Sequence, residues 1–223
     1  MSKNSFSLVV FDLDGTLYPL TFSFRTYFFA SLLSTYSLWK AHRTTFTELR
    51  GKRFENGEML CAEHMEMVAE KTGKPVRMVK EWYFEHFYSV FIRAIRNKVV
   101  LRPHFMMLLR SLKKKGVASA VLSDYGKINE RLAALRVESD LFDITISGEE
   151  FGVLKPGTDA VLHIAETLSV SPERTLIIGD KEESDGALAQ KTGMSKLILG
   201  TRKDNGKVIS WDDVHRVLSE VSN

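Results

Sequence analysis

The sequence of 223 residues has very little cysteine: Cys61 is the single one. One thiol can form neither an internal disulfide nor a thiolate metal cluster within the chain. The six histidines show no paired ligand spacing, so zinc is not expected, and we expect His64, His86 and His163 on helix surfaces or in packing. These absences fit a reducing compartment and leave oxygen ligands for a metal site.

Long apolar runs are also missing. The most membrane-like segment, residues 21–39, reads TFSFRTYFFASLLSTYSLW, and Arg25 and several hydroxyl residues interrupt it. Its uninterrupted apolar stretches fall far below the roughly 18 residues of a membrane span. The first residues, MSKNSFSLVV, have no long apolar core before a small-residue cleavage site, which argues against a signal peptide. We therefore expect a cytoplasmic protein without a membrane partner.

A strong excess of either charge is absent as well. The chain carries 31 basic and 28 acidic residues, for a net charge of +3, so no overall field points to nucleic acid or to a membrane surface. Neither GxxxxGK followed by Ser or Thr nor GxGxxG occurs, which argues against a nucleoside triphosphatase or a dinucleotide enzyme. The expected partner is a small molecule, and we expect a monomer or a weak homodimer.

Residues 8–18 read LVVFDLDGTLY and join an apolar run directly to two acidic residues, a glycine and a threonine. The continuous apolar run at their start is typical of a strand buried on both faces of a parallel sheet. Asp12 and Asp14 follow where that strand ends, which is where ligands bind in parallel α/β sheets. Gly15 and Thr16 then form a turn whose N–H groups can hold an anion beside a carboxylate-bound cation. An ordinary strand with an Asp-Gly turn is the alternative.

Polar residues follow other predicted strands in the same way. Apolar runs predict these strands at 118–122, 143–146, 175–178 and 196–199. Ser123 and Asp124 follow the first run, and Asp180 follows the third, with Asp185 close behind. Lys155 lies in a loop just before a proline, between two strand ends that carry acids. Ser123 or Asp124, taken singly, is equally consistent with a cap of the next helix.

Residues 18–101 show apolar side chains at helical spacing, with no strand-like alternation. The sequence therefore predicts an α/β fold: a Rossmann-like parallel-sheet core of residues 1–17 and 102–223 with an inserted all-helical cap domain. Within the insertion, RGKRFENGEM predicts a loop between helices. Its Arg50 and Arg53 are candidate substrate contacts that would set specificity; solvated surface charge is the alternative.

The predicted strand ends bring acids, one hydroxyl and one lysine to one edge of the sheet. Oxygen ligands without histidine or cysteine select a hard cation, and few carboxylates with room for water favour Mg²⁺. Metal and lysine would neutralise phosphate oxygens, the hydroxyl and turn amides would orient them, and a carboxylate can attack phosphorus to form an aspartyl-phosphate. This set of groups predicts phosphoryl transfer.

Four segments resemble, in order and spacing, the haloacid dehalogenase-like hydrolase superfamily. They are FDLDGTLY at residues 11–18, VLSD with Ser123, VLKPG with Lys155, and GDKEESD at residues 179–185. The resemblance covers the whole chain and implies that the helical insertion is the superfamily's cap, which closes over the substrate. One departure is Lys181, where many relatives carry a small polar residue.

The resemblance also implies roles for the site residues. Asp12 would be the nucleophile, and Asp14 the general acid and then the general base, with Lys155 as a further catalytic residue. Mg²⁺ would be held by Asp12, the Asp14 backbone carbonyl and Asp180, and Asp185 would orient that shell or pair with Lys155. Contacts to the substrate phosphate are expected from Gly15, Thr16, Ser123, Asp124 and Lys155.

The function expected from these residues is hydrolysis of a small phosphorylated metabolite by a Mg²⁺-dependent phosphatase. The dehalogenase members of the superfamily lack the second acid two residues after the nucleophile, so Asp14 favours phosphate over halide chemistry. Two alternatives remain: a phosphomutase, which returns the phosphoryl group to a sugar, and a catalytically weak relative that binds a ligand or partner through its cap.

Overall fold

The structure is a computed structural model that describes residues 6–200 and 208–220. Its centre is a sheet of five strands in the order β3-β2-β1-β4-β5, and all four neighbouring pairs are parallel. The strands are β1 (Leu8–Phe11), β2 (Ala118–Ser123), β3 (Ile144–Ser147), β4 (Thr175–Gly179) and β5 (Ser195–Ile198). The predicted α/β fold with a Rossmann-like parallel sheet is confirmed, and each predicted strand is present within about one residue of its expected ends.

The central strand β1 is buried on both faces, as its continuous apolar run predicts. Val9 and Phe11 join one apolar cluster, whereas Leu8 and Val10 join a second cluster on the opposite face. Side chains of a strand alternate between the two faces, so an uninterrupted apolar sequence is needed where helices cover both sides.

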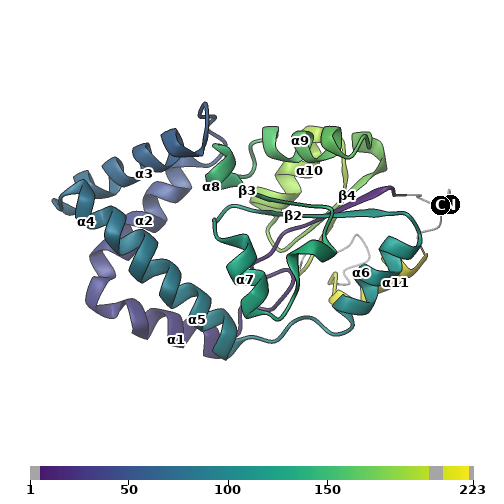
Figure 1. The fold of residues 1–223 in the computed structure, drawn as a ribbon, viewed down its shortest axis with the longest axis horizontal. Coiled ribbons are helices and arrows are strands. Elements are labelled where there is room, and N and C mark those ends of the chain that lie inside the picture. The colour runs from purple at the N-terminus through teal and green to yellow at the C-terminus, as the bar shows by residue number, and fades with distance from the viewer. Residues whose placement is uncertain (1–5, 201–207, 221–223) are drawn as a thin grey trace.

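Helices form a layer on each face of the sheet (Figure 1). One layer contains α9 (Asp159–Thr167) and α10 (Ala187–Thr192), and the other contains α6 (Phe105–Lys114), α7 (Ile128–Ala134) and α11 (Trp211–Glu220). The short α8 (Gly148–Phe151) follows β3 directly. In the described part of the chain no helix is both long and apolar enough to cross a membrane.

Two of the helices that cover the sheet have well-defined cap residues. Gly193 ends α10 in the left-handed conformation, with φ of 70°, which favours a residue without a side chain. At the start of α11, the Ser210 hydroxyl and backbone N–H both donate to Asp213 Oδ2, at 2.9 and 3.0 Å. Ser210 and Asp213 therefore form a capping pair at the start of α11.

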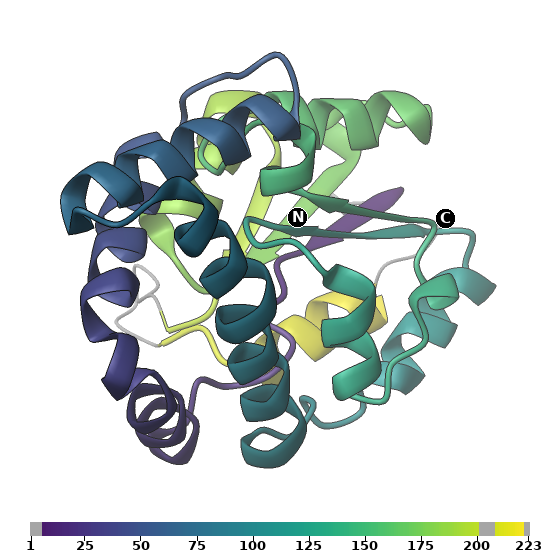
Figure 2. The same cartoon turned by 60° about the vertical axis from the view of Figure 1, so that its left-hand side comes forward.

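A group of helices between β1 and α6 lies to one side of the sheet (Figures 1 and 2). It contains α1 (Phe22–Leu32), α2 (Tyr36–Leu49), α3 (Gly57–Thr72), α4 (Val76–Glu81) and α5 (Tyr88–Lys98), with a further helical segment at Trp82–Phe87. The chain enters and leaves this group at one place, because Arg102 N donates to Leu17 O at 2.8 Å. We propose residues 18–101 as one inserted unit, called the cap below; residues 1–5, 201–207 and 221–223 of the expected core lie outside the described residues.

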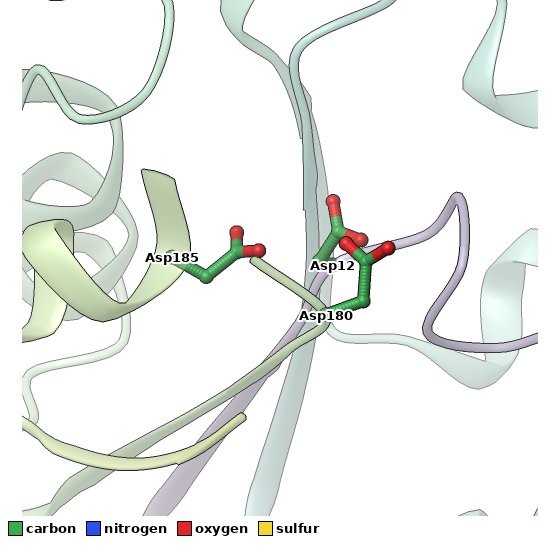
Figure 3. Close-up of side chains that lie close together, drawn as sticks. All are labelled: Asp12, Asp180 and Asp185. Carbon is green, nitrogen blue, oxygen red and sulfur yellow. The ribbon is translucent and has the colours of Figure 1, made fainter. Parts of the chain in front are cut away.

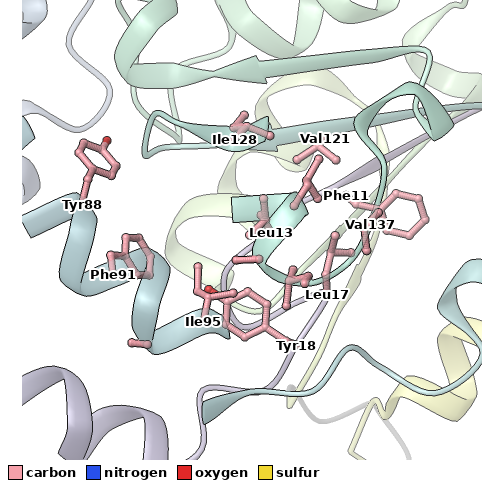
Figure 4. Close-up of a cluster of buried hydrophobic side chains, with 14 of the residues drawn as sticks. Phe11, Leu13, Leu17, Tyr18, Tyr88, Phe91, Ile95, Val121, Ile128 and Val137 are labelled. Carbon is pink, nitrogen blue, oxygen red and sulfur yellow. The ribbon is translucent and has the colours of Figure 1, made fainter. Parts of the chain in front are cut away.

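The cap and the sheet share one apolar interior. Tyr88, Phe91 and Ile95 of α5 belong to the same buried cluster as Leu13 and Tyr18, which follow β1 (Figure 4). Burial of such side chains stabilises a fold by about 1.5–3 kcal/mol each. The packing therefore fixes α5 next to the turn that carries the first acidic motif.

Candidate active site

A small cavity at the carboxyl ends of the strands collects most of the predicted site residues. Its volume is about 40 Å³, which is room for a few waters. The cavity is lined by Asp12, Asp14, Arg50, Ser123, Asp124, Tyr125, Lys155, Asp180, Lys181, Ser184 and Asp185. Because β2, β1 and β4 are neighbours in the sheet, the residues that end them meet at one edge, as the sequence predicts.

Three carboxylates form the acidic centre of the cavity (Figure 3). Asp12, Asp180 and Asp185 each offer an oxygen, and these oxygens lie within 4.8 Å of one another. Among the described residues, no hydrogen bond or ion pair reaches the Asp180 carboxylate. Burial, followed by the neighbouring Asp12 carboxylate, raises the pKa of Asp180 to about 7. A group of this kind, with only oxygen donors, can hold a hard metal cation.

Lys155 is buried among these acids. Its Nζ donates to Asp12 Oδ1 and to Asp185 Oδ1, both at 2.6 Å. Burial alone would lower the pKa of Lys155, but the carboxylates of Asp12 and Asp185 outweigh it and raise the pKa well above its usual value. The amine is therefore charged, and it fixes the positions of two of the three carboxylates.

The turn after β1 orients Asp12. Thr16 Oγ1 donates to Asp12 Oδ2 at 2.9 Å, and Thr16 is fully buried. Gly15 has φ of +94°, and a Cβ added there would come within 2.2 Å of Asp180 Oδ2. Gly15 and Thr16 are thus placed beside Asp12 and Asp180 but do not line the cavity.

Asp14 points toward a different set of partners. Tyr18 OH donates to its Oδ1 at 2.5 Å, and Arg131 Nη1 donates to its Oδ2 at 2.7 Å. Both Tyr18 and Arg131 are fully buried. The Asp14 side chain, which lines the cavity, is therefore held by two donors and is not part of the group of three carboxylates.

Ser123 and Asp124 line the cavity, and neither caps the helix that follows. The residue before α7 is Lys127, and no side chain caps that helix end, so the capping alternative is wrong. Asp124 Oδ1 instead accepts the backbone N–H of Lys155 at 2.8 Å. Burial raises the pKa of Asp124 above its usual value.

The loop between α2 and α3 brings one cap arginine to the cavity. Gly51 N donates to Leu154 O at 3.1 Å and Phe54 N donates to Gly152 O at 3.0 Å, so the loop docks on the segment that carries Lys155. Arg50 lines the cavity, and its Nε is buried without a hydrogen-bond partner in the described structure.

Arg53 is placed elsewhere. Its Nε pairs with Asp159 Oδ1 at 3.1 Å, and its side chain is 79% exposed. The two arginines that the sequence treats alike are therefore in different positions, and Arg50 alone of this pair lines the cavity.

Sequence reasoning missed two arginines that hold the site together. Arg102 donates from Nε to Thr16 O and from Nη2 to Gly15 O, both at 3.2 Å, and so fixes the turn after β1. The sequence does carry a signal for Arg131, because its spacing places it on the same helical face as Ile128 and Leu135. A charged residue at a core-facing position is a signal for a buried partner.

Comparisons with known proteins place the chain in a family. A family model described as haloacid dehalogenase-like hydrolase matches residues 6–193. Phosphoglycolate phosphatase of Aquifex aeolicus is 27% identical over 182 residues, which are 78% of this chain and 76% of that protein. Glyceraldehyde 3-phosphate phosphatase of Methanocaldococcus jannaschii is 30% identical over 106 residues, 46% of each protein.

A solved structure shows the same fold. The 2-haloacid dehalogenase of Pseudomonas syringae pv. Tomato DC3000 superposes with a TM-score of 0.63 over 96% of this chain and 98% of that one. The two sequences are 20% identical, so the likeness concerns the fold and not the reaction.

Proposed function

Since the chain belongs to the haloacid dehalogenase-like hydrolases, we propose that it is a Mg²⁺-dependent phosphatase. Its substrate would be a small phosphorylated metabolite, and the phosphoryl group would pass through an aspartyl-phosphate on Asp12. Relatives named as phosphatases support this class of reaction.

The observation that carries the proposal is the fixed orientation of the Asp12 carboxylate. One oxygen accepts from Lys155 Nζ and the other from Thr16 Oγ1. A nucleophile that lines a cavity and is held by two donors needs little reorganisation before attack. Asp180, which lacks a direct partner in the described structure, lies beside it.

In the proposed reaction, an Asp12 oxygen forms a bond to phosphorus while the bond from phosphorus to the substrate's oxygen breaks. Asp14 gives a proton to the departing oxygen, and then takes a proton from the water that attacks the phosphoryl group. Phosphate leaves and Asp12 is restored. Ser123, Asp124 and Lys155 line the cavity and would orient or neutralise the transferring group.

The donor set fits a magnesium ion. Asp12, Asp180 and Asp185 supply carboxylate oxygens, and the Asp14 backbone carbonyl is a further proposed ligand. Bound Mg²⁺ would neutralise charge that develops on the transferring phosphoryl group. Lys155 already compensates part of the negative charge of Asp12 and Asp185, whereas Asp180 has no ion pair among the described residues.

The cap loop supports a substrate with a second anionic group. Arg50 presents a half-buried guanidinium to the cavity, and its Nε has no hydrogen-bond partner in the described structure. A planar guanidinium binds a carboxylate or a phosphate with two parallel hydrogen bonds. A phosphorylated carboxylic acid, such as the substrate in the name of the Aquifex aeolicus relative, fits this requirement.

The test is phosphate release from p-nitrophenyl phosphate and a panel of metabolite phosphates, with Mg²⁺ and with EDTA. Asp12→Asn should lower the rate by about 10³-fold or more, because the nucleophile is lost. Asp140→Asn, a change at an exposed aspartate, is the matched control and should keep the rate. Release that is independent of Asp12 would overturn the proposal.

The same panel separates the alternatives. A phosphomutase would interconvert phosphate isomers without releasing phosphate, and a binding relative would take up a panel member without turnover. Product analysis by phosphorus NMR distinguishes these outcomes from hydrolysis.

A further inference from the structure

Arg131 of α7 is a fully buried arginine that does not line the cavity. It occupies a helical position between Ile128 and Leu135, both of which face the core. A buried guanidinium is rare unless it is paired. Its partners therefore indicate why the helix carries a charge at this position.

The guanidinium touches two residues that line the cavity. Nη1 donates to Asp14 Oδ2 at 2.7 Å, and Nη2 donates to Ser123 Oγ at 2.7 Å and to the Tyr125 carbonyl at 3.3 Å. The guanidinium carbon lies 5.4 Å from the centre of the Phe91 ring of the cap. The Arg131 side chain therefore contacts three parts of the fold: the turn after β1, the end of β2, and α5.

The chemistry of this contact fixes the direction of the Ser123 hydrogen bond. A guanidinium has donors and no acceptor, so Ser123 Oγ accepts from Arg131. The single hydroxyl hydrogen is then left to be donated elsewhere. In this structure it is donated to Asp14 Oδ2 over the long distance of 3.4 Å, and Ser123 lines the cavity that contains Asp12.

We propose that Arg131 is a positioning residue that makes the Ser123 hydroxyl a hydrogen-bond donor toward the transferring phosphoryl group. It acts on that group through Ser123 and does not itself line the cavity. The inference rests on the proposed phosphatase function, since it assigns the phosphoryl group as the acceptor. Donation from Arg131 also polarises the hydroxyl, which strengthens its bond to an anionic oxygen.

A purely structural role for Arg131 predicts a different result for variants at positions 131 and 123. Removing one member of a buried ion pair destabilises a protein, and activity would then follow stability whatever residue stands at position 123. The positioning role instead requires that the effect of changing Arg131 depend on the Ser123 hydroxyl. A double-mutant cycle separates the two roles.

The experiment measures kcat/KM for p-nitrophenyl phosphate, and the inhibition constant for inorganic phosphate, in wild type, Arg131→Lys, Ser123→Ala and the double variant. Lysine keeps the charge but cannot donate to both partners in the same geometry. We expect losses in kcat/KM of about tenfold for Arg131→Lys and about 100-fold for Ser123→Ala. The double variant should stay within about threefold of Ser123→Ala, and phosphate inhibition should weaken in the same pattern.

Controls keep the result decisive. Arg136→Lys changes an exposed arginine just beyond the same helix and should leave both constants unchanged. Losses that multiply in the double variant overturn the positioning role, because the two residues then act independently. If wild type releases no phosphate, the proposed function fails before the cycle begins. Arg131→Met, followed by thermal unfolding, measures the structural contribution separately; if it does not fold, Arg131→Lys still completes the cycle.

Discussion

Two groups of buried titratable residues in the described structure show opposite electrostatic arrangements. At the edge of the sheet, Lys155 is charged and paired with Asp12 and Asp185. Inside the cap, His42 and His64 contact each other at 2.9 Å, between Nδ1 of the first and Nε2 of the second, and are fully buried among aromatic rings. The site keeps charges in place for a ligand, whereas the cap interior excludes charge.

The shifted pKa values of Asp180 and His64 make the stability of the fold depend on pH in opposite directions. Burial raises the pKa of Asp180 to about 7, so the folded chain holds a proton that the unfolded chain releases between about pH 4 and pH 7. Stability from this group is therefore lost as pH rises through that range. Burial lowers the pKa of His64 to about 4, so the unfolded chain binds a proton below about pH 6.5 while the folded chain does not. Stability from His64 is lost as pH falls.

The largest effect is expected from Lys155→Met, which removes the positive charge from the acidic centre. Asp12 and Asp185 are then buried without their cation, so we expect the free energy of unfolding at pH 8 to fall by about 3–5 kcal/mol and phosphate release to stop. Urea unfolding and the phosphatase assay measure the two losses. Lys191→Met, at an exposed lysine that donates to the Pro156 carbonyl, should change either quantity little. Unchanged stability in Lys155→Met would mean that the edge of the sheet does not depend on charge pairing.

The next effect concerns Asp180→Asn in the absence of metal. Because the shift in the pKa of Asp180 is about three units upward, the variant should be more stable than wild type at pH 8 by about 2–4 kcal/mol. The difference should shrink toward pH 4, and Mg²⁺ should stabilise wild type far more than the variant. Urea unfolding at several pH values, with EDTA and with Mg²⁺, checks this. Equal stabilisation of both proteins by Mg²⁺ would place the cation elsewhere.

The cap is tested by the double variant His42→Phe with His64→Leu. Replacing both members of the pair by apolar side chains is close to neutral at pH 7.5. Near pH 4.5 the loss of the His64 proton uptake alone should make the variant more stable than wild type by about 2–3 kcal/mol, and the lowered pKa of His42 adds to the difference in the same direction. Acid unfolding followed by circular dichroism measures the difference, and His163→Gln, at an exposed histidine, is the control. Parallel pH curves for variant and wild type would contradict a neutral buried pair.

The sequence predicts the sheet and its edge better than it predicts the cap. The central strands are short apolar runs that end at polar residues. The positions of Asp12, Ser123 and Asp180 at one edge of the sheet can therefore be predicted from the local sequence and from the rule that ligands bind at the carboxyl ends of parallel strands. The histidine pair is not readable in this way. His42 and His64 are 22 residues apart on two helices, and their contact depends on how α2 packs against α3.

The arginines show the same limit. Arg131 gives a signal in its helical spacing, but its contacts with Asp14 and Ser123 follow from the position of α7 beside the sheet. Arg50 and Arg53 are nearly adjacent in one basic loop, and the sequence cannot rank them. Backbone hydrogen bonds from that loop to residues 152–154 decide that Arg50 lines the cavity.

The smallest effect is expected when substitutions of Arg50 and Arg53 are compared. This comparison tests whether the cap contributes a charge to the site. Arg50→Gln should raise KM about tenfold for a phosphorylated carboxylic acid, because one charge-assisted contact is lost, and should change KM for p-nitrophenyl phosphate much less. Arg53→Gln removes an exposed ion pair with Asp159, which is worth about 0–1 kcal/mol, and should leave both KM values unchanged. Equal effects of the two substitutions on both substrates would show that the loop acts through its overall charge. The difference expected here depends on position: the cap interior excludes charge, and the docked loop carries a charge only where it faces the cavity.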